Sequence, residues 1–143
     1  MGKFDLNTLF LLPDLFHLGV PPTLVDSLFY LLKKIGLEKL VDRANQLGSI
    51  MRSSLDEMKK KYPIIGDVRG RGAMQAIELV MPGTKDPNPA ALTSAIKYCQ
   101  QKGVLILSAG TYGNVIRLLP PLVMPEHLLK EALSILDEAL AQA

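Results

Sequence analysis

The sequence has few of the residues that mark specialised classes of protein. Its 143 residues include one cysteine, no tryptophan and only 6% aromatic residues, and the formal net charge is +2. A single cysteine, Cys99, excludes an intrachain disulfide framework, and its helical context predicts a buried small side chain in a reducing, cytoplasmic location. The small net charge gives no electrostatic argument for a nucleic-acid partner. Disulfide-stapled secreted domains and strongly basic domains are therefore excluded.

Long hydrophobic runs are also missing. The run from Leu9 to Leu12 is far shorter than the roughly 20 apolar residues of a membrane-spanning helix. Asp5, Asn7 and Asp14 interrupt the apolar stretch near the N-terminus, and no small-residue cleavage site of a signal peptide follows it. We therefore expect a soluble protein with no membrane partner. An apolar content of 48% in a chain of 143 residues predicts a single aliphatic core.

The longest amphipathic pattern begins at Thr23, whose spacing from Asp26 resembles that of a helix-capping box. Apolar residues then recur at helical spacing up to the lysines before Pro63, with a bend or break expected near Gly36. Two more helices are expected downstream, one over Pro89–Lys102 and one that opens at residues 125–126. The chain thus carries three amphipathic helical patterns.

Short runs rich in Val, Ile and Leu predict the strands. They cover residues 64–68, 73–81, 104–109 and 115–119. The first two runs flank Arg69-Gly70-Arg71-Gly72, whose glycines predict a bulge or a close backbone approach. The last two are separated by a turn of small residues and predict a hairpin. The order helix, strands, helix, strands, helix predicts an α/β (α+β) fold, a two-layer sandwich with helices on one face of a sheet of three or four strands.

One charged residue interrupts the last apolar run. Arg117 is expected to share a strand face with Val115 and Leu119. The opposite face then carries Ile116 and Leu118. Because an unpaired guanidinium is costly to desolvate, Arg117 must reach solvent, pair with an internal carboxylate, or bind an anion from elsewhere. Its planar donors suit a carboxylate held by two hydrogen bonds, but the residues alone leave all three alternatives open.

No other pattern completes an active site. His17 lies among leucines and His127 lies in a helical turn, so we expect both to be structural and no metal to be bound. Gly70-Arg71-Gly72 lacks the third glycine of a dinucleotide-binding fingerprint, and no phosphate-binding loop is present. The same segment has no neighbouring aromatic residues that could stack on RNA bases, so we expect no nucleic-acid partner.

The sequence resembles the C-terminal small domain of the class III pyridoxal-phosphate-dependent aminotransferases, and among them the 4-aminobutyrate aminotransferases. The blocks GDVRGRG at residues 66–72 and NVIRLLPPL at residues 114–122 carry this resemblance. Order and spacing continue to match from near Leu31 to the C-terminus. The resemblance implies the small domain of a fold-type I enzyme, in agreement with the two-layer sandwich expected from the pattern of elements.

The resemblance also implies a role for Arg117, because the arginine of the NVIR strand in this family holds the carboxylate of the amino-acid substrate. The family's Asp67–Gly72 turn mainly brings strands together, so no catalytic role is expected for Arg69 or Arg71. The lysine, the aspartate and the phosphate loops that bind pyridoxal phosphate belong to the preceding large domain, and Lys33 and Lys34 match none of them. We therefore expect no bound cofactor and no transamination by this chain alone.

The expected domain organisation is an apolar segment of unclear role over residues 1–22 and an aminotransferase-like small domain over residues 23–143. The first hypothesis for function is the small domain of a 4-aminobutyrate-type aminotransferase. The alternative is a non-catalytic or engineered self-associating module, because leucine and phenylalanine are dense in residues 4–32. Under either hypothesis we expect a homo-oligomer, in particular a dimer.

Overall fold

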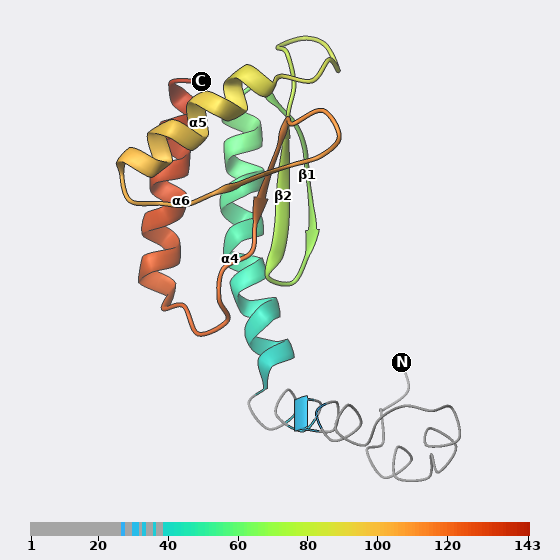
Figure 1. The fold of residues 1–143 in the computed structure, drawn as a ribbon, viewed down its shortest axis with the longest axis vertical. Helices are drawn as coiled ribbons and strands as arrows, with labels where there is room; N and C mark the ends of the chain where they lie inside the picture. Colours follow the sequence, from blue (N-terminus) through green and yellow to red (C-terminus); the bar gives the residue numbers. More distant parts are fainter. Residues whose placement is uncertain (1–26, 28–29, 32, 34–35, 37–38) are drawn as a thin grey trace, which may run out of the picture. The chain divides into compact units, whose positions relative to one another are not determined.

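The computed structural model describes residues 27, 30, 31, 33, 36 and 39–143. Contacts divide the chain into two units, Met1–Lys39 and Leu40–Ala143, and the second unit contains every element named below. In chain order (Figure 1) these elements are α4 Leu40–Lys61, β1 Ile65–Arg71, β2 Met74–Leu79, α5 Pro89–Gln101, β3 Leu107–Ala109, β4 Val115–Leu118 and α6 Glu126–Ala141. The segment 1–22 and its expected boundary with residue 23 lie outside the described residues.

The predicted break in the long N-terminal helix is present, three residues after Gly36. Gly36 is helical, whereas Lys39 has a positive φ of 49°, a backbone conformation that ends a right-handed helix. Helix α4 then begins at Leu40 and ends at Lys61, where three consecutive lysines complement the helix dipole. Leu47, Gly48, Met51, Leu55 and Met58 are buried at helical spacing. One side of α4 therefore faces the core.

The other two helices also agree with the prediction. Helix α5 begins with Pro89 after the N-cap Asn88, whose side chain accepts a hydrogen bond of 3.0 Å from the Ala91 amide. Gly103, with a φ of 81°, follows its C-terminus. Helix α6 packs against both α4 and α5 (Figure 1). Among the described helices, none is long and apolar enough to cross a membrane.

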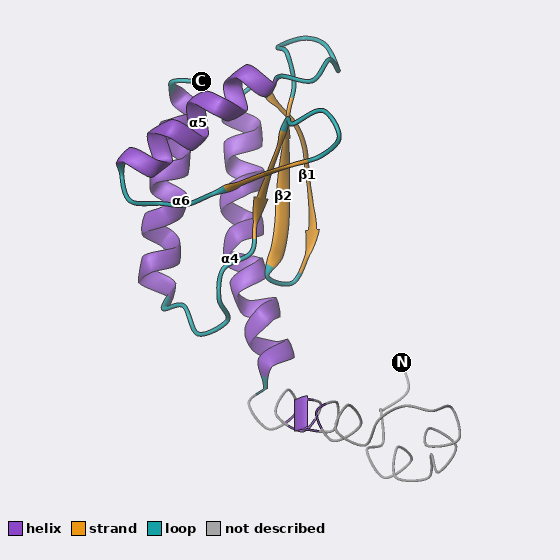
Figure 2. Ribbon diagram, viewed as in Figure 1, coloured by secondary structure: helices purple, strands orange, loops and turns teal. Residues whose placement is uncertain are grey.

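The sheet has four strands in the order β1-β2-β4-β3, and each neighbouring pair is antiparallel. Helices α4 and α5 contact the strands, and α6 packs against these two helices on the same side of the sheet (Figure 2), in agreement with the predicted sandwich of helices and sheet. The inner faces of the strands contribute Ile65, Val68, Ile77, Leu79 and Ile116 to the hydrophobic core. Because side chains alternate along a strand, the residues between them lie on the outer face of the sheet.

The glycines near residue 70 produce the predicted close backbone approach. Gly72, with a φ of 54°, lies in the turn between β1 and β2. A Cβ atom placed on Gly48 of α4 would overlap the carbonyl group of Gly72, so the helix and the turn meet backbone to backbone. The irregular pairing in β1 falls elsewhere, between Ile65 and Asp67.

Candidate functional site

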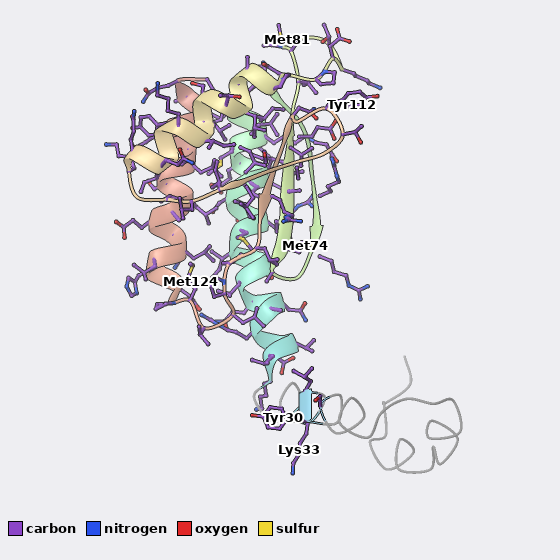
Figure 3. The ribbon with its side chains drawn as sticks, in the orientation of Figure 1. Tyr30, Lys33, Met74, Met81, Tyr112 and Met124 are labelled. Carbon is purple, nitrogen blue, oxygen red and sulfur yellow. The ribbon has the colours of Figure 1, made fainter. Side chains whose placement is uncertain are left out.

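The outer face of the sheet is the surface on which the predicted site residue lies. Strand register aligns Arg69, Ala76, Arg117 and Leu107 in one row across all four strands. Large apolar side chains on and beside this face remain exposed, namely Met74 (Figure 3), Leu105, Leu107 and Leu119. This mixture of arginine and exposed apolar side chains is typical of a surface that binds another group.

Arg117 occupies the strand face that the sequence predicted. Its neighbour Ile116 is fully buried in the core, whereas Arg117 is exposed on β4. Val115 shares the face of Arg117 but is buried, because the turn at Gly110 lies against its side chain. No described residue forms a hydrogen bond or an ion pair with the Arg117 guanidinium. Of the three alternatives for Arg117, the internal ion pair is therefore excluded within the described part of the chain.

A cavity of about 540 Å³ lies beside this arginine. Its walls are the segment 102–107 before and within β3, the segment 117–121 at the end of β4, and the side of α6. The lining is mainly apolar, and its charged members are Lys102, Arg117 and Glu131. An apolar cavity with Arg117 among its lining residues suits a small molecule that has an aliphatic body and a carboxylate.

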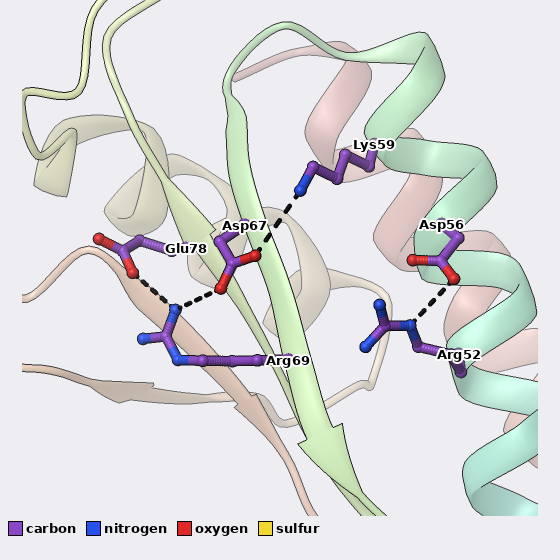
Figure 4. A network of polar contacts seen from close by, with 6 residues as sticks. All are labelled: Arg52, Asp56, Lys59, Asp67, Arg69 and Glu78. Carbon is purple, nitrogen blue, oxygen red and sulfur yellow. Dashed lines mark hydrogen bonds and ion pairs between the residues drawn. The ribbon is translucent and has the colours of Figure 1, made fainter.

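A second arginine in the same row has two carboxylate partners (Figure 4). The Nη1 atom of Arg69 lies 2.6 Å from Glu78 and 3.1 Å from Asp67. The Glu78 carboxylate, then Asp67, raises the pKa of Arg69, and the Arg69 guanidinium holds the pKa of Asp67 below its usual range. Lys59 of α4 approaches Asp67 at 3.6 Å. The sequence analysis assigned Arg69 to a strand turn and did not predict this network of ion pairs. The pattern in the sequence that could have predicted it is the alternation of charged residues along two paired strands.

Arg43 of α4 fixes the segment that follows β4, which sequence reasoning also missed. Its guanidinium donates hydrogen bonds of 3.1 Å to the Leu122 carbonyl and 2.6 Å to the Met124 carbonyl. It also pairs with Glu126 at 3.4 Å. Because Leu122 lies five residues after Arg117, this clamp holds the chain that leaves the candidate site.

Of the remaining candidates from the sequence, neither Cys99 nor His127 lines the cavity. Cys99 is fully buried in the core, as predicted, and burial raises the pKa of its thiol. His127 is exposed on α6 and Lys33 is also exposed, whereas His17 and Lys34 lie outside the described residues. Within the described part of the chain, no group of three His, Cys, Asp or Glu side chains could hold a metal ion.

Fold and site together define a small α/β domain with a carboxylate-suited arginine. The family described as Aminotransferase class-III matches residues 24–140. The chain therefore belongs to the class-III aminotransferase family. This agrees with the resemblance found in the sequence blocks at residues 66–72 and 114–122.

Individual relatives are aminotransferases of ω-amino acids. The 5-aminovalerate aminotransferase DavT of Pseudomonas putida is 47% identical over 105 residues, which cover 73% of this chain and 25% of that protein. The 4-aminobutyrate aminotransferase GabT of Escherichia coli is 39% identical over 113 residues, which cover 78% of this chain and 26% of that protein. The chain thus spans about a quarter of the length of these curated relatives.

Solved structures have the same arrangement. An aminotransferase of Bacillus anthracis has a TM-score of 0.71 and 31% sequence identity, with 78% of this chain and 26% of that chain covered. A phospholyase of Arthrobacter in complex with phosphoethanolamine has a TM-score of 0.73 and 32% identity, with 79% of this chain and 27% of that chain covered. Both comparisons again match a quarter of a longer protein.

The described residues do not fit pyridoxal phosphate, the cofactor that the family implies. This cofactor needs a lysine, a carboxylate for its ring nitrogen and donors for its phosphate. The one lysine that lines the cavity, Lys102, has its Nζ atom 5.6 Å from the centroid of the Tyr98 ring, in a cation–π contact. The first turn of α6 beside the cavity carries Glu126, whose charge opposes a phosphate. We therefore assign no catalytic step to these residues through the cofactor.

Proposed function

We propose that this chain supplies the small domain of a pyridoxal-phosphate-dependent aminotransferase that acts on ω-amino acids such as 4-aminobutyrate. In this proposal Arg117 binds the carboxylate of the substrate. The named substrates of the relatives, 4-aminobutyrate and 5-aminovalerate, both carry a carboxylate on an aliphatic chain. Such a molecule matches the apolar cavity wall and the single guanidinium beside it.

The proposal depends mainly on the unpaired state of Arg117. Arg43, Arg52 and Arg69 all form ion pairs with carboxylates. Arg71 and Arg117 have no such partner among the described residues, and of these two only Arg117 lines the cavity. Its guanidinium would orient the substrate by two parallel hydrogen bonds. The cofactor, held by a large domain, would supply the electron sink for the reaction.

The test is a chimeric enzyme in which residues 40–143 replace the corresponding part of Escherichia coli GabT. Removal of a desolvated charge partner costs about 2 to 5 kcal/mol. We therefore expect Arg117→Gln to lower kcat/KM for 4-aminobutyrate by roughly 30-fold to several thousand-fold. Activity toward butylamine, which lacks a carboxylate, should stay nearly unchanged. Arg71→Gln is the matched control, and an equal loss in both variants would refute the assignment.

A second experiment tests whether the chain alone is inactive. We expect that borohydride reduction of a mixture of the purified chain and pyridoxal phosphate gives no stoichiometric adduct on one lysine, because the described residues lack the set of groups that holds the cofactor. Mass spectrometry of tryptic peptides measures this. A single modified lysine together with transaminase activity would contradict the proposal.

Self-association is the proposed quaternary behaviour, in keeping with a dimeric enzyme. It is supported by exposed apolar side chains, among which Leu105 is 83% and Val123 is 87% exposed. Light scattering of the full chain and of a chain without residues 1–22 separates the two hypotheses for function. Dimerisation that depends on residues 1–22 would favour the self-associating module, whereas dimerisation of both chains would favour the aminotransferase domain.

A further inference from the structure

Two arginines, Arg69 and Arg117, flank the same carboxylate, Glu78, on the outer face of the sheet. Arg69 and Arg117 lie on opposite sides of Ala76, which pairs with Arg69 of β1 and with Arg117 of β4. Glu78 is two residues further along β2 and points to the same outer face. It is therefore diagonal to both arginines at the same register offset, a separation that long side chains can bridge.

Only one of these two possible ion pairs is formed. Arg69 lies 2.6 Å from Glu78, whereas Arg117 has no partner among the described residues. Asp67 explains why Arg69 holds this position, because the same Nη1 atom also lies 3.1 Å from Asp67 (Figure 4). With Lys59 at 3.6 Å from Asp67, the group contains two cations and two carboxylates. Its charges balance, and Arg117 keeps an uncompensated positive charge.

We propose that Arg69, fixed by Asp67, holds the Glu78 carboxylate away from Arg117 and so acts as a positioning residue for the substrate-binding guanidinium. This inference rests on the proposed function of Arg117. Without Arg69, Glu78 would pair with Arg117 and compete with the substrate carboxylate. The energy of an exposed ion pair of this kind corresponds to a roughly two- to fivefold weaker binding of carboxylate.

The experiment uses the full 143-residue chain with ¹⁵N-labelled arginine. The NMR signal of the Arg117 side chain is assigned by its loss in Arg117→Lys, and rotation of its guanidinium about the Nε–Cζ bond is measured from line shapes. We expect Arg69→Gln to slow this rotation, because Arg117 then pairs with Glu78. The double variant Arg69→Gln/Glu78→Gln should restore the rotation rate of the wild type.

Two controls identify the cause. Arg52→Gln removes another paired arginine, whose partner Asp56 lies one turn away on the same helix, and should leave the Arg117 signal unchanged (Figure 4). Arg69→Lys keeps the positive charge and should retain most of the wild-type rotation. If Arg69→Gln leaves the rotation of Arg117 at the wild-type rate while the chain stays folded, the inference is wrong.

Titration with 4-aminobutyrate, with butylamine as the comparison lacking a carboxylate, separates this inference from the proposed function. We expect the Arg117 signal to respond to 4-aminobutyrate two- to fivefold more weakly in Arg69→Gln, with recovery in the double variant. If Arg117→Gln in the chimeric enzyme keeps the wild-type kcat/KM for 4-aminobutyrate but Arg69→Gln still slows the rotation in the isolated chain, the pairing inference stands and the proposed function fails. A normal response of wild type and Arg69→Gln alike would overturn the inference alone.

Discussion

The meeting of α4 with the β1–β2 turn gives the sharpest prediction for stability, through the substitution Gly48→Ala. In an exposed helix this change would gain about 1 kcal/mol from helix propensity. Here the new Cβ atom would overlap the carbonyl carbon and oxygen of Gly72, which are backbone atoms and cannot rotate away. Overpacking costs about 1 to 3 kcal/mol. Because the atoms that the new Cβ would meet belong to the backbone, the cost at Gly48 should reach or exceed the upper end of this range. We expect a net loss of about 2 kcal/mol.

The assay is urea denaturation of the full chain, with Gly36→Ala as the matched control. Gly36 is also helical, but a Cβ atom there would meet nothing within 4 Å. Gly36→Ala should therefore be neutral or stabilising, whereas Gly48→Ala lowers the free energy of unfolding. Amide shifts at the β1–β2 turn should accompany that loss, because the Gly72 carbonyl accepts a hydrogen bond of 2.9 Å from Gln75. Equal or higher stability of Gly48→Ala would refute the backbone contact.

Three further predictions concern the sheet. Asn114→Ala should lower the free energy of unfolding by about 1 to 3 kcal/mol in the same assay, since its buried amide donates a hydrogen bond of 2.9 Å to the Leu79 carbonyl; an unchanged value would show that this bond contributes little. Because the pKa of Asp67 is lowered, its ion pairs contribute to the free energy of unfolding above about pH 4, and this contribution is lost as pH falls through the folded-state pKa. Asp67→Asn should therefore be less stable than wild type at pH 7 by under about 1 kcal/mol and equally stable at the acid end. A stability difference that grows toward low pH would contradict this sign. Arg117→Ala should change the stability of the chain by less than about 0.5 kcal/mol, because the side chain is exposed and has no described partner; a large loss in thermal unfolding would point to a structural ion pair.

Local chemistry in the sequence was enough to predict most of the fold. Apolar periodicity located the helices, Asn88 and Pro89 marked the start of α5, and alternation placed Arg117 on the outer face. These features depend on residues close together in the chain, and so a single sequence contains them. The break before α4 was predicted near Gly36 but occurs three residues later, at Lys39. Lys39 is not a glycine, so its positive φ could not be predicted from the residue type.

Interactions between distant segments could not be predicted in the same way. The pairing of Arg69 with Glu78 depends on the register of β1 and β2, and the clamp from Arg43 to Leu122 joins residues 79 positions apart. Asn114 was expected only as a turn residue, yet it is buried and fastens β2 to the turn before β4. The unpaired state of Arg117 likewise required the positions of all neighbouring strands. Sequence alone could therefore name this residue but could not choose among its three possible partners.

The most direct test of the central claim is a crystal structure of the chimeric enzyme with bound 4-aminobutyrate. We expect both carboxylate oxygens of this ligand to lie about 2.7 to 2.9 Å from the guanidinium nitrogens of Arg117, with Arg69 still paired to Glu78. A ligand carboxylate held by other residues, with Arg117 facing solvent or paired with Glu78, would contradict the claim.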